Sequence, residues 1–250
     1  MTTPSFAAQK KAWSSPPVDD IGYLPATDLL AMNDHDFCTV MRKMEENRYG
    51  GWRNLRNHWI DSLRIDDTHD KRVLDYGCGV GMEALQFAPT NRVWVADIVP
   101  ANLEVAKRLF ALSDYELEGA LLITGRKPFL KPPEPLDVIH CSGVLHHIVD
   151  PIPVVEAMAS WLVPGGQLRL MLYSDTAWAA ATGEYPPPDD VTDSPLREKF
   201  VRHWDAVGDW ADWYNQQRLV DRFGEWFTVG DYRKITRGGE YVGAVLVKHA

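Results

Sequence analysis

A glycine-rich turn in the segment VLDYGCGVG, residues 73–81, is the most specific chemical signal in the chain. Gly77, Gly79 and Gly81 alternate after an apolar stretch, and glycine lets a ligand approach the backbone closely. Met82 stands where the dinucleotide fingerprint GxGxxG has its third glycine. Asp75, two residues before the first glycine, would repel a pyrophosphate. The segment favours a nucleoside ligand with a positive charge and no phosphate, and a tight turn without a ligand is the alternative.

A second acidic residue, Asp97, closes the apolar segment RVWVAD, residues 92–97. A carboxylate at the end of the second strand of an α/β sheet can accept hydrogen bonds from both ribose hydroxyls. The alternative is an acid that caps the following helix. Since a dinucleotide also carries ribose, Asp97 does not decide which cofactor binds.

Two adjacent histidines, His146 and His147, follow the expected fourth strand and are the candidate catalytic residues. Histidine titrates near neutral pH, so one of them could serve as a general base. The alternative for both is local packing, and His140, inside the strand, is expected to be structural. Cys78 and Cys141 have no motif-like histidine partner, which argues against a cysteine nucleophile. The three cysteines are far apart and form no CxxC pair, so we expect no metal site and no disulfide.

Short apolar segments alternate with helical patterns through the middle of the chain. Alternation at this spacing predicts βαβ units and a parallel sheet, hence an α/β fold. The expected strands are 72–77, 92–97, 120–124, 136–143 and 166–174, and the expected helices are 82–88, 101–112 and 153–162. A Gly238–Gly239 turn between two apolar segments predicts a terminal hairpin.

The segments that flank the alternating region differ from it in pattern, and we expect them to belong to the same domain. Residues 1–20 are polar and proline-containing and predict a flexible tail. We expect a domain over 21–250, comprising helical material at 21–67, a core at 70–174, an insert at 175–225 and a closing hairpin at 226–250. Within the insert, apolar residues three or four apart predict one continuous helix, with Leu196, Phe200, Trp204, Val207, Trp210 and Tyr214 on one face.

Composition and net charge limit the kinds of molecule that the protein is expected to bind. The 250 residues carry a formal net charge of −9 and a pI of about 5.3, which disfavours binding to nucleic acid. The first residues lack the apolar region of a secretory signal, and no apolar run is long enough to span a membrane. We therefore expect a cytoplasmic protein, and the sequence predicts no particular oligomeric state.

Four segments in order resemble the class I S-adenosylmethionine-dependent methyltransferases. VLDYGCGVG is similar to their first motif, VWVADIVPANLEVAK to the acidic loop after the second strand, and LDVIHCSGVLHHIVDP to the fourth-strand motif. SWLVPGGQLRL resembles their helix–turn–strand unit with a Pro-Gly-Gly loop. The resemblance covers about residues 70–174. It implies a Rossmann-like, doubly wound, mostly parallel seven-stranded sheet with an antiparallel C-terminal strand.

The resemblance also implies a set of cofactor contacts. S-adenosylmethionine would be the cofactor, S-adenosylhomocysteine the product, and no metal would be needed. The methionine end would lie on the glycine loop, the ribose on Asp97, and the adenine beside Ile98. The family usually has an acid after the third strand, where this chain has Thr124, Gly125 and Arg126, so the adenine would be bound by backbone groups. The full implied set is Arg48, Tyr49, Asp75, Tyr76, Gly77, Cys78, Gly79, Gly81, Asp97, Ile98, Thr124, Gly125, Arg126, Ser142, Gly143 and Val144.

The class of acceptor is inferred by analogy. The sequence CSGVLHH stands where the DNA-amine branch has an Asp/Asn-Pro-Pro-Tyr/Phe motif, which disfavours methylation of DNA bases. Together with the acidic pI this favours methyl transfer to O, N or C of a small molecule rather than to a macromolecule. Two alternatives stay open, a silent or repurposed S-adenosylmethionine-binding protein and a nicotinamide oxidoreductase, and Asp75 opposes the second.

Overall fold

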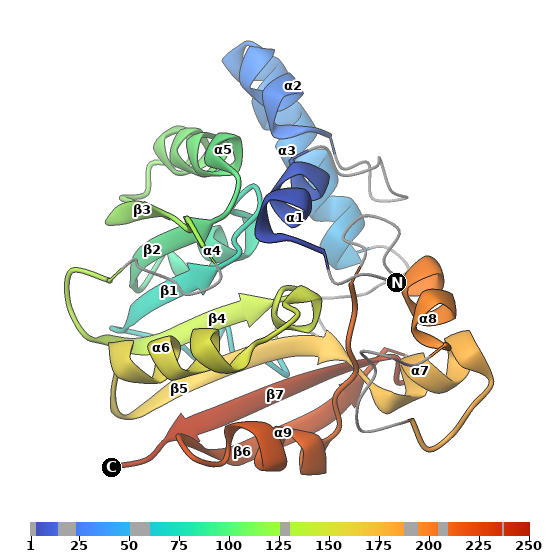
Figure 1. The fold of residues 1–250 in the computed structure, drawn as a ribbon. Coiled ribbons are helices and arrows are strands. Elements are labelled where there is room, and N and C mark those ends of the chain that lie inside the picture. Colours follow the sequence, from blue (N-terminus) through green and yellow to red (C-terminus); the bar gives the residue numbers. More distant parts are fainter. Residues whose placement is uncertain are drawn as a thin grey trace.

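The computed structural model describes residues 4–14, 24–50, 61–125, 131–187, 195–204, 210–236 and 238–250, with only the backbone at 48–50. Within them a seven-stranded sheet has the order β3-β2-β1-β4-β5-β7-β6 (Figure 1). Its strands are β1 Arg72–Tyr76, β2 Arg92–Asp97, β3 Gly119–Leu122, β4 Leu136–Ser142, β5 Leu162–Tyr173, β6 Phe227–Ile235 and β7 Tyr241–Lys248. The first five run parallel, and β7 pairs antiparallel with β5 and β6. The predicted α/β fold and the terminal hairpin are confirmed.

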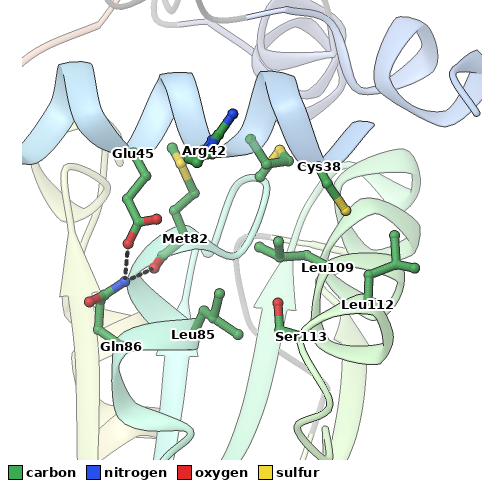
Figure 2. Close-up of a pocket in the computed structure, with 10 residues that line it drawn as sticks. Cys38, Arg42, Glu45, Met82, Leu85, Gln86, Leu109, Leu112 and Ser113 are labelled. Carbon is green, nitrogen blue, oxygen red and sulfur yellow. Dashed lines mark hydrogen bonds between the residues drawn. The ribbon is translucent and has the colours of Figure 1, made fainter. Parts of the chain in front are cut away.

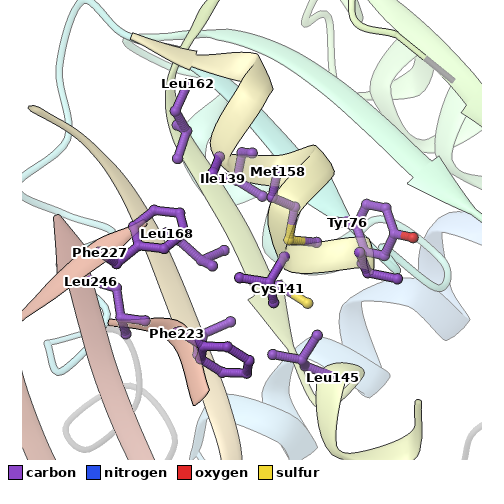
Figure 3. Close-up of a cluster of buried hydrophobic side chains, with 14 of the residues drawn as sticks. Tyr76, Ile139, Cys141, Leu145, Met158, Leu162, Leu168, Phe223, Phe227 and Leu246 are labelled. Atoms are coloured by element: carbon purple, nitrogen blue, oxygen red, sulfur yellow. The ribbon is translucent and has the colours of Figure 1, made fainter. Parts of the chain in front are cut away.

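Helices cover both faces of the sheet. The helices α4 Met82–Phe87 and α5 Pro100–Leu112 share a buried cluster with Val73 of β1, whereas α6 Ile152–Trp161 and α9 Gln216–Phe223 share another with Leu74. Neighbouring residues of a strand point to opposite faces, so the central strands need apolar residues at nearly every position. Figure 3 shows part of the α6–α9 cluster, in which Met158 of α6 lies beside Cys141 of β4.

The beginning of the chain contains a helix that the sequence did not predict. Residues Phe6–Trp13 form α1, whose first turn is capped by the Ser5 side chain accepting from the Ala8 N–H at 3.1 Å. The expectation of a flexible tail over 1–20 is therefore wrong for this part. Two further helices, α2 Ala26–Ala31 and α3 Asp34–Gly50, lie against α5. The helical prediction for 21–67 holds over these described residues.

The insert before the last hairpin is not one long helix. It contains α7 Asp175–Thr182 and α8 Arg197–Trp204, but residues 210–215 are extended and precede α9. The Tyr214 N–H donates to the Tyr173 carbonyl at 2.8 Å, and Ser174 and Tyr214 form a parallel bridge. The single-helix prediction is wrong here because the backbone pairs with the end of β5. Asn215 then caps a new helix by accepting from the Arg218 N–H at 2.8 Å.

Smaller differences concern the ends of elements. The third strand ends at Leu122 rather than residue 124, and the fifth begins at Leu162, four residues earlier than predicted. The helix expected at 153–162 is α6, Ile152–Trp161. In the described part of the chain, no helix has the length and apolarity that a membrane crossing requires.

Candidate functional site

Two of the three glycines in the loop are closely packed against other residues, and the middle one borders open space. Gly77, Gly79 and Gly81 have φ angles of +78°, +53° and +85°, which side chains rarely tolerate. A Cβ at Gly77 would lie 2.3 Å from Val144 Cγ2, and one at Gly81 would lie 2.8 Å from Ala106 Cβ. A Cβ at Gly79 would meet nothing within 4 Å. The outer glycines therefore let the chain pack, whereas the central one borders space that a ligand can fill.

Asp97 ties this loop to the second strand. Its Oδ2 accepts from the Gly79 N–H at 2.9 Å, and its Oδ1 accepts from the Val99 N–H at 2.8 Å. Asn102 Nδ2 donates to the same Oδ1 at 3.2 Å. Burial raises the pKa of Asp97, and the hydrogen bonds from Val99 and Gly79 oppose that rise. An acceptor side chain thus lies directly beside the open position of the loop.

Asp75, two residues before Gly77, is a second carboxylate near the loop. It is buried on β1, in register with Val95 of β2 and His140 of β4. Burial, followed by the negative charges of Asp97 and Asp75, raises the pKa of the Cys78 thiol well above its usual value. Cys78 is therefore a protonated thiol, which agrees with the prediction that it is no nucleophile.

The end of the fourth strand reaches the same loop. Gly143 has a φ of +74°, and its N–H donates to the Met171 carbonyl at 3.1 Å. This turn brings the Val144 side chain against Gly77, where it leaves no room for a Cβ atom, and Ser142 ends the strand before them. Residues expected from two distant sequence segments therefore meet at one edge of the sheet.

Some of the remaining predicted contact residues lie near the glycine loop, and others do not or are outside the described residues. Ile98 is half-buried after β2, and the Ile123 N–H donates to the Asp97 carbonyl at 2.9 Å, which brings Thr124 and Gly125 to the same edge. Tyr76 is buried in the α6–α9 cluster, so its side chain points away from the α4–α5 face. The side chains of Arg48 and Tyr49, and all of Arg126, lie outside the described residues.

The two candidate histidines occupy a short 3-10 turn, Leu145–His147, and differ in tautomer. His146 Nδ1 accepts from the Tyr173 N–H at 3.3 Å, so its proton is on Nε2. His147 Nδ1 lies 3.0 Å from the Trp210 carbonyl, which can only accept, so this ring keeps its lone pair on Nε2. Burial, and then the neighbouring His147, lowers the pKa of His146 well below 6.5. Both rings are buried, with exposed fractions of 1% and 7%.

Two segments that the sequence did not connect with the site hold these histidines. The Asp212 N–H donates to the His146 carbonyl at 2.8 Å, and Gln9 Nε2 of α1 donates to the His147 carbonyl at 2.7 Å. The Trp13 ring lies 5.1 Å from the His147 ring, and Figure 1 shows α1 beside the carboxyl ends of the central strands. The signals that the sequence offered are two helix-capping residues, Ser5 before α1 and Asn215 before α9.

The extended segment 210–215 is fixed by a buried ion cluster. The Asp212 carboxylate lies 2.9 Å from Arg218 Nη1 and 2.7 Å from Arg222 Nη1. Arg218 stacks over the Trp213 ring at 4.2 Å, and Arg222 also donates to the Tyr214 hydroxyl at 3.0 Å. The Trp210 carbonyl that lies beside His147 Nδ1 belongs to the same segment, two residues before Asp212.

His140 has a buried partner inside the fold. Its Nε2 lies 2.6 Å from Glu83 Oε2, and its ring lies 5.3 Å from that of Phe87, edge on. This arrangement agrees with the structural role expected for it. Among the described residues, no three His, Cys, Asp or Glu side chains gather in a metal-binding group.

Comparison with known proteins identifies the family. A family profile described as a methyltransferase domain matches residues 44–234. The chain therefore belongs to the methyltransferase-domain family, as its motifs indicated. The resemblance noted in the sequence and the fold class are both confirmed.

Individual relatives agree with this assignment over part of their length. The chain is 34% identical to a ubiquinone biosynthesis O-methyltransferase of Stutzerimonas stutzeri (strain A1501) over 118 residues, 44% of this chain and 50% of that one. A similar enzyme of Xylella fastidiosa (strain M23) is 36% identical over 123 residues, 44% of this chain and 48% of that one. The chain thus spans about half the length of these curated relatives.

A solved structure shares the fold throughout. The N-methyltransferase NodS from Bradyrhizobium japonicum WM9, in complex with S-adenosyl-L-homocysteine, superposes with a TM-score of 0.55 over 97% of both chains. Its sequence identity is 14%, so the likeness concerns the fold.

Proposed function

We propose that this protein transfers a methyl group from S-adenosylmethionine to O, N or C of a small-molecule acceptor. The observation that carries the proposal is the open position at Gly79, whose N–H donates to the Asp97 carboxylate. Buried Asp75 adds a second negative charge, which acts on the neighbouring Cys78 thiol. Two carboxylates beside a loop that no side chain fills suit a cationic nucleoside and oppose a pyrophosphate. Membership of the methyltransferase-domain family supports the same conclusion.

Different residues of the site would contact different parts of the cofactor. Asp75, Gly77, Cys78 and Gly79 would hold the methionine end, and Asp97 would accept from the ribose while it fixes the loop through the Gly79 N–H. Ile98, with the backbone of Thr124 and Gly125, would border the adenine, and Ser142, Gly143 and Val144 would lie below the methionyl part. When bound, S-adenosylmethionine supplies an activated methyl group on a sulfonium, and the protein aligns the acceptor and excludes water.

Of the two histidines, we assign the general base to His147. The Trp210 carbonyl holds its Nδ1 proton, so the basic lone pair is on Nε2. His146 instead uses Nδ1 to accept the Tyr173 N–H, and burial disfavours its charged form. A base must take a proton from the acceptor and become charged, so the ring with the lowered pKa is the poorer candidate.

The acceptor would be a small molecule bound by the segments outside the core. We propose that residues 21–67 and 175–225 of the domain select the acceptor, while 70–174 bind the cofactor. The name of the curated relatives, ubiquinone biosynthesis O-methyltransferase, supports an oxygen acceptor on a small organic molecule. Cytoplasmic location stays a prediction from the sequence.

One observation favours a second candidate, a cofactor-binding protein without methyl transfer. Thr124 and Gly125 occupy the place where the family usually has an adenine-binding acid. The [4+2]-cyclase SpnF shares the fold with a TM-score of 0.55 at 12% identity, over 76% of this chain and 80% of its own. The same fold therefore occurs in a protein that is named for a different reaction.

A turnover assay separates these candidates. The protein is incubated with S-adenosylmethionine and a panel of small phenols, carboxylic acids and amines, and formation of S-adenosylhomocysteine is measured. We expect turnover with at least one phenol, lost in His147→Gln and retained in His146→Gln. Cofactor binding without turnover across the whole panel would favour the second candidate.

A further inference from the structure

Arg108 of α5 forms hydrogen bonds with both α2 and the first residue of α3. Arg108 Nη1 donates to the Leu29 and Leu30 carbonyls at 3.1 and 3.4 Å, and Nη2 donates to the Met32 carbonyl at 2.7 Å. Asp34 Oδ1 accepts from Nη2 and Nε, at 2.7 and 3.2 Å. The guanidinium therefore binds carbonyls at the end of α2 and the acid that begins α3.

The same side chain also packs against α3. The Arg108 Cζ atom lies 4.4 Å from the centroid of the Phe37 ring, and the side chain is only 20% exposed. A planar group with several fixed donors can make all of these contacts together, whereas a lysine ammonium cannot. Arg108 thus connects the two helices to α5 at the corner where they meet.

A second polar contact attaches the other half of α3. Glu45 Oε1 accepts from Gln86 Nε2 of α4 at 3.1 Å, and Figure 2 shows this bond below α3. Asp34 and Glu45 are eleven residues apart, about 16 Å along a helix. Between these points runs a groove of about 140 Å³ with a largely apolar lining that includes Met82, Leu109 and Leu112. Pockets for small-molecule ligands are usually about 300–1,000 Å³, so we interpret this groove as incomplete packing.

The underside of α3 covers the glycine loop. Val80, within the loop, and Met82, directly after it, belong to the buried cluster that contains Phe37, Met41 and Met44 of α3. Both residues are at most 5% exposed. The loop is thus held by Asp97 on the side of the open position and by α3 on the apolar side.

We infer that Arg108 is a positioning residue for the cofactor loop. It keeps α3 docked on α5, and docked α3 holds Val80 and Met82, and with them the backbone between Gly77 and Gly81. The inference rests on the proposed function, since it assigns the docking of α3 to cofactor binding. Loss of Arg108 should weaken cofactor binding more than it slows the bound enzyme.

The test compares Arg108→Met with Lys107→Met. Lys107 is the neighbouring cation on α5, more exposed, and paired with Glu104. Methionine keeps the apolar stem and removes the donors. Affinity for S-adenosylhomocysteine is measured by calorimetry, and amide hydrogen exchange is followed in residues 34–47, in 77–82 and in the central strands.

The expected result has three parts. Arg108→Met binds S-adenosylhomocysteine at least tenfold more weakly, and exchange accelerates in α3 and at residues 77–82, with β4 and β5 still protected. Lys107→Met stays within twofold of the wild type in every readout. Arg108→Lys gives an intermediate loss, because one point charge replaces the fork of donors.

Two results would overturn the inference. Faster amide exchange in α3, with unchanged exchange at residues 77–82 and unchanged affinity for S-adenosylhomocysteine, would show that docking of α3 does not position the loop. An equal loss of hydrogen-exchange protection in α3 and in the central strands would show that Arg108 has a general structural role. In that case Gln86→Leu, which removes the second attachment of α3, tests in a folded protein whether docking of α3 positions the loop. If the wild type itself does not bind S-adenosylhomocysteine, the proposed function fails, and exchange at residues 77–82 still decides the positioning role.

Discussion

Asp97 carries the most specific prediction about a single residue. Its carboxylate accepts from Gly79, Val99 and Asn102, so it both shapes the glycine loop and faces the position left open at Gly79. In Asp97→Asn the side-chain amide nitrogen cannot accept, and one of these contacts is lost. We expect affinity for S-adenosylhomocysteine to fall at least tenfold, about 1.4 kcal/mol, by titration calorimetry. Glu104→Gln, an exposed change on α5, is the matched control, and equal affinity of both variants would refute the assignment.

His146 predicts a specific pH dependence of stability. Its folded pKa lies well below 6.5 because burial and His147 disfavour the charge. Its contribution to stability is therefore complete above pH 6.5 and is lost as the pH falls below that value, because the unfolded chain takes up a proton first. In His146→Gln the free energy of unfolding should fall less steeply between pH 6.5 and 5, measured by urea unfolding. An unchanged slope would contradict the lowered pKa.

At the scale of elements, the extended segment 210–215 is the part that the sequence interpretation missed. Its buried Asp212 pairs with both Arg218 and Arg222, so Asp212→Asn leaves two buried or half-buried cations without their carboxylate. Loss of one partner from a buried ion pair typically costs about 3–5 kcal/mol. We expect a clear loss of thermal stability, together with reduced turnover, because the Trp210 carbonyl no longer holds His147 in place.

The matched control is Asp221→Asn on α9. Asp221 is exposed and accepts only from Gln217 among its described hydrogen bonds, at 2.8 Å. Its replacement should change stability by less than about 0.5 kcal/mol. If Asp212→Asn behaves like this control, the ion cluster does not hold the segment.

For the whole molecule, local patterns predicted the sheet because each central strand is buried on both faces. The strands that contain Val73, Val93 and Ile139 are buried at nearly every position, and the glycines and Asp97 stand at the expected strand ends. Alternation of these segments with helices was therefore sufficient to predict the α/β fold, whereas the cofactor contacts stay a prediction that the family resemblance implies.

The surroundings of His146 and His147 depend on contacts between distant segments, which local patterns do not encode. Gln9 reaches His147 across 138 positions of the chain, and the backbone of Tyr214 pairs with Tyr173. Apolar residues three or four apart at 196–214 fit a helix, but the unpaired edge at the end of β5 provided a competing partner for the backbone. Tertiary pairing prevailed over local periodicity there.

Thermal unfolding with saturating ligand tests the central claim most directly. The protein is heated alone and with S-adenosylmethionine, S-adenosylhomocysteine or NAD, and Asp97→Asn is measured alongside. A ligand at 100 times its dissociation constant stabilises a protein by about 2.7 kcal/mol, which for a chain of this size is roughly 5–10 °C. We predict such a shift with the first two ligands and not with NAD, and a smaller shift in the variant. A shift with NAD alone, or none with the two adenosyl ligands, would contradict the proposed cofactor site.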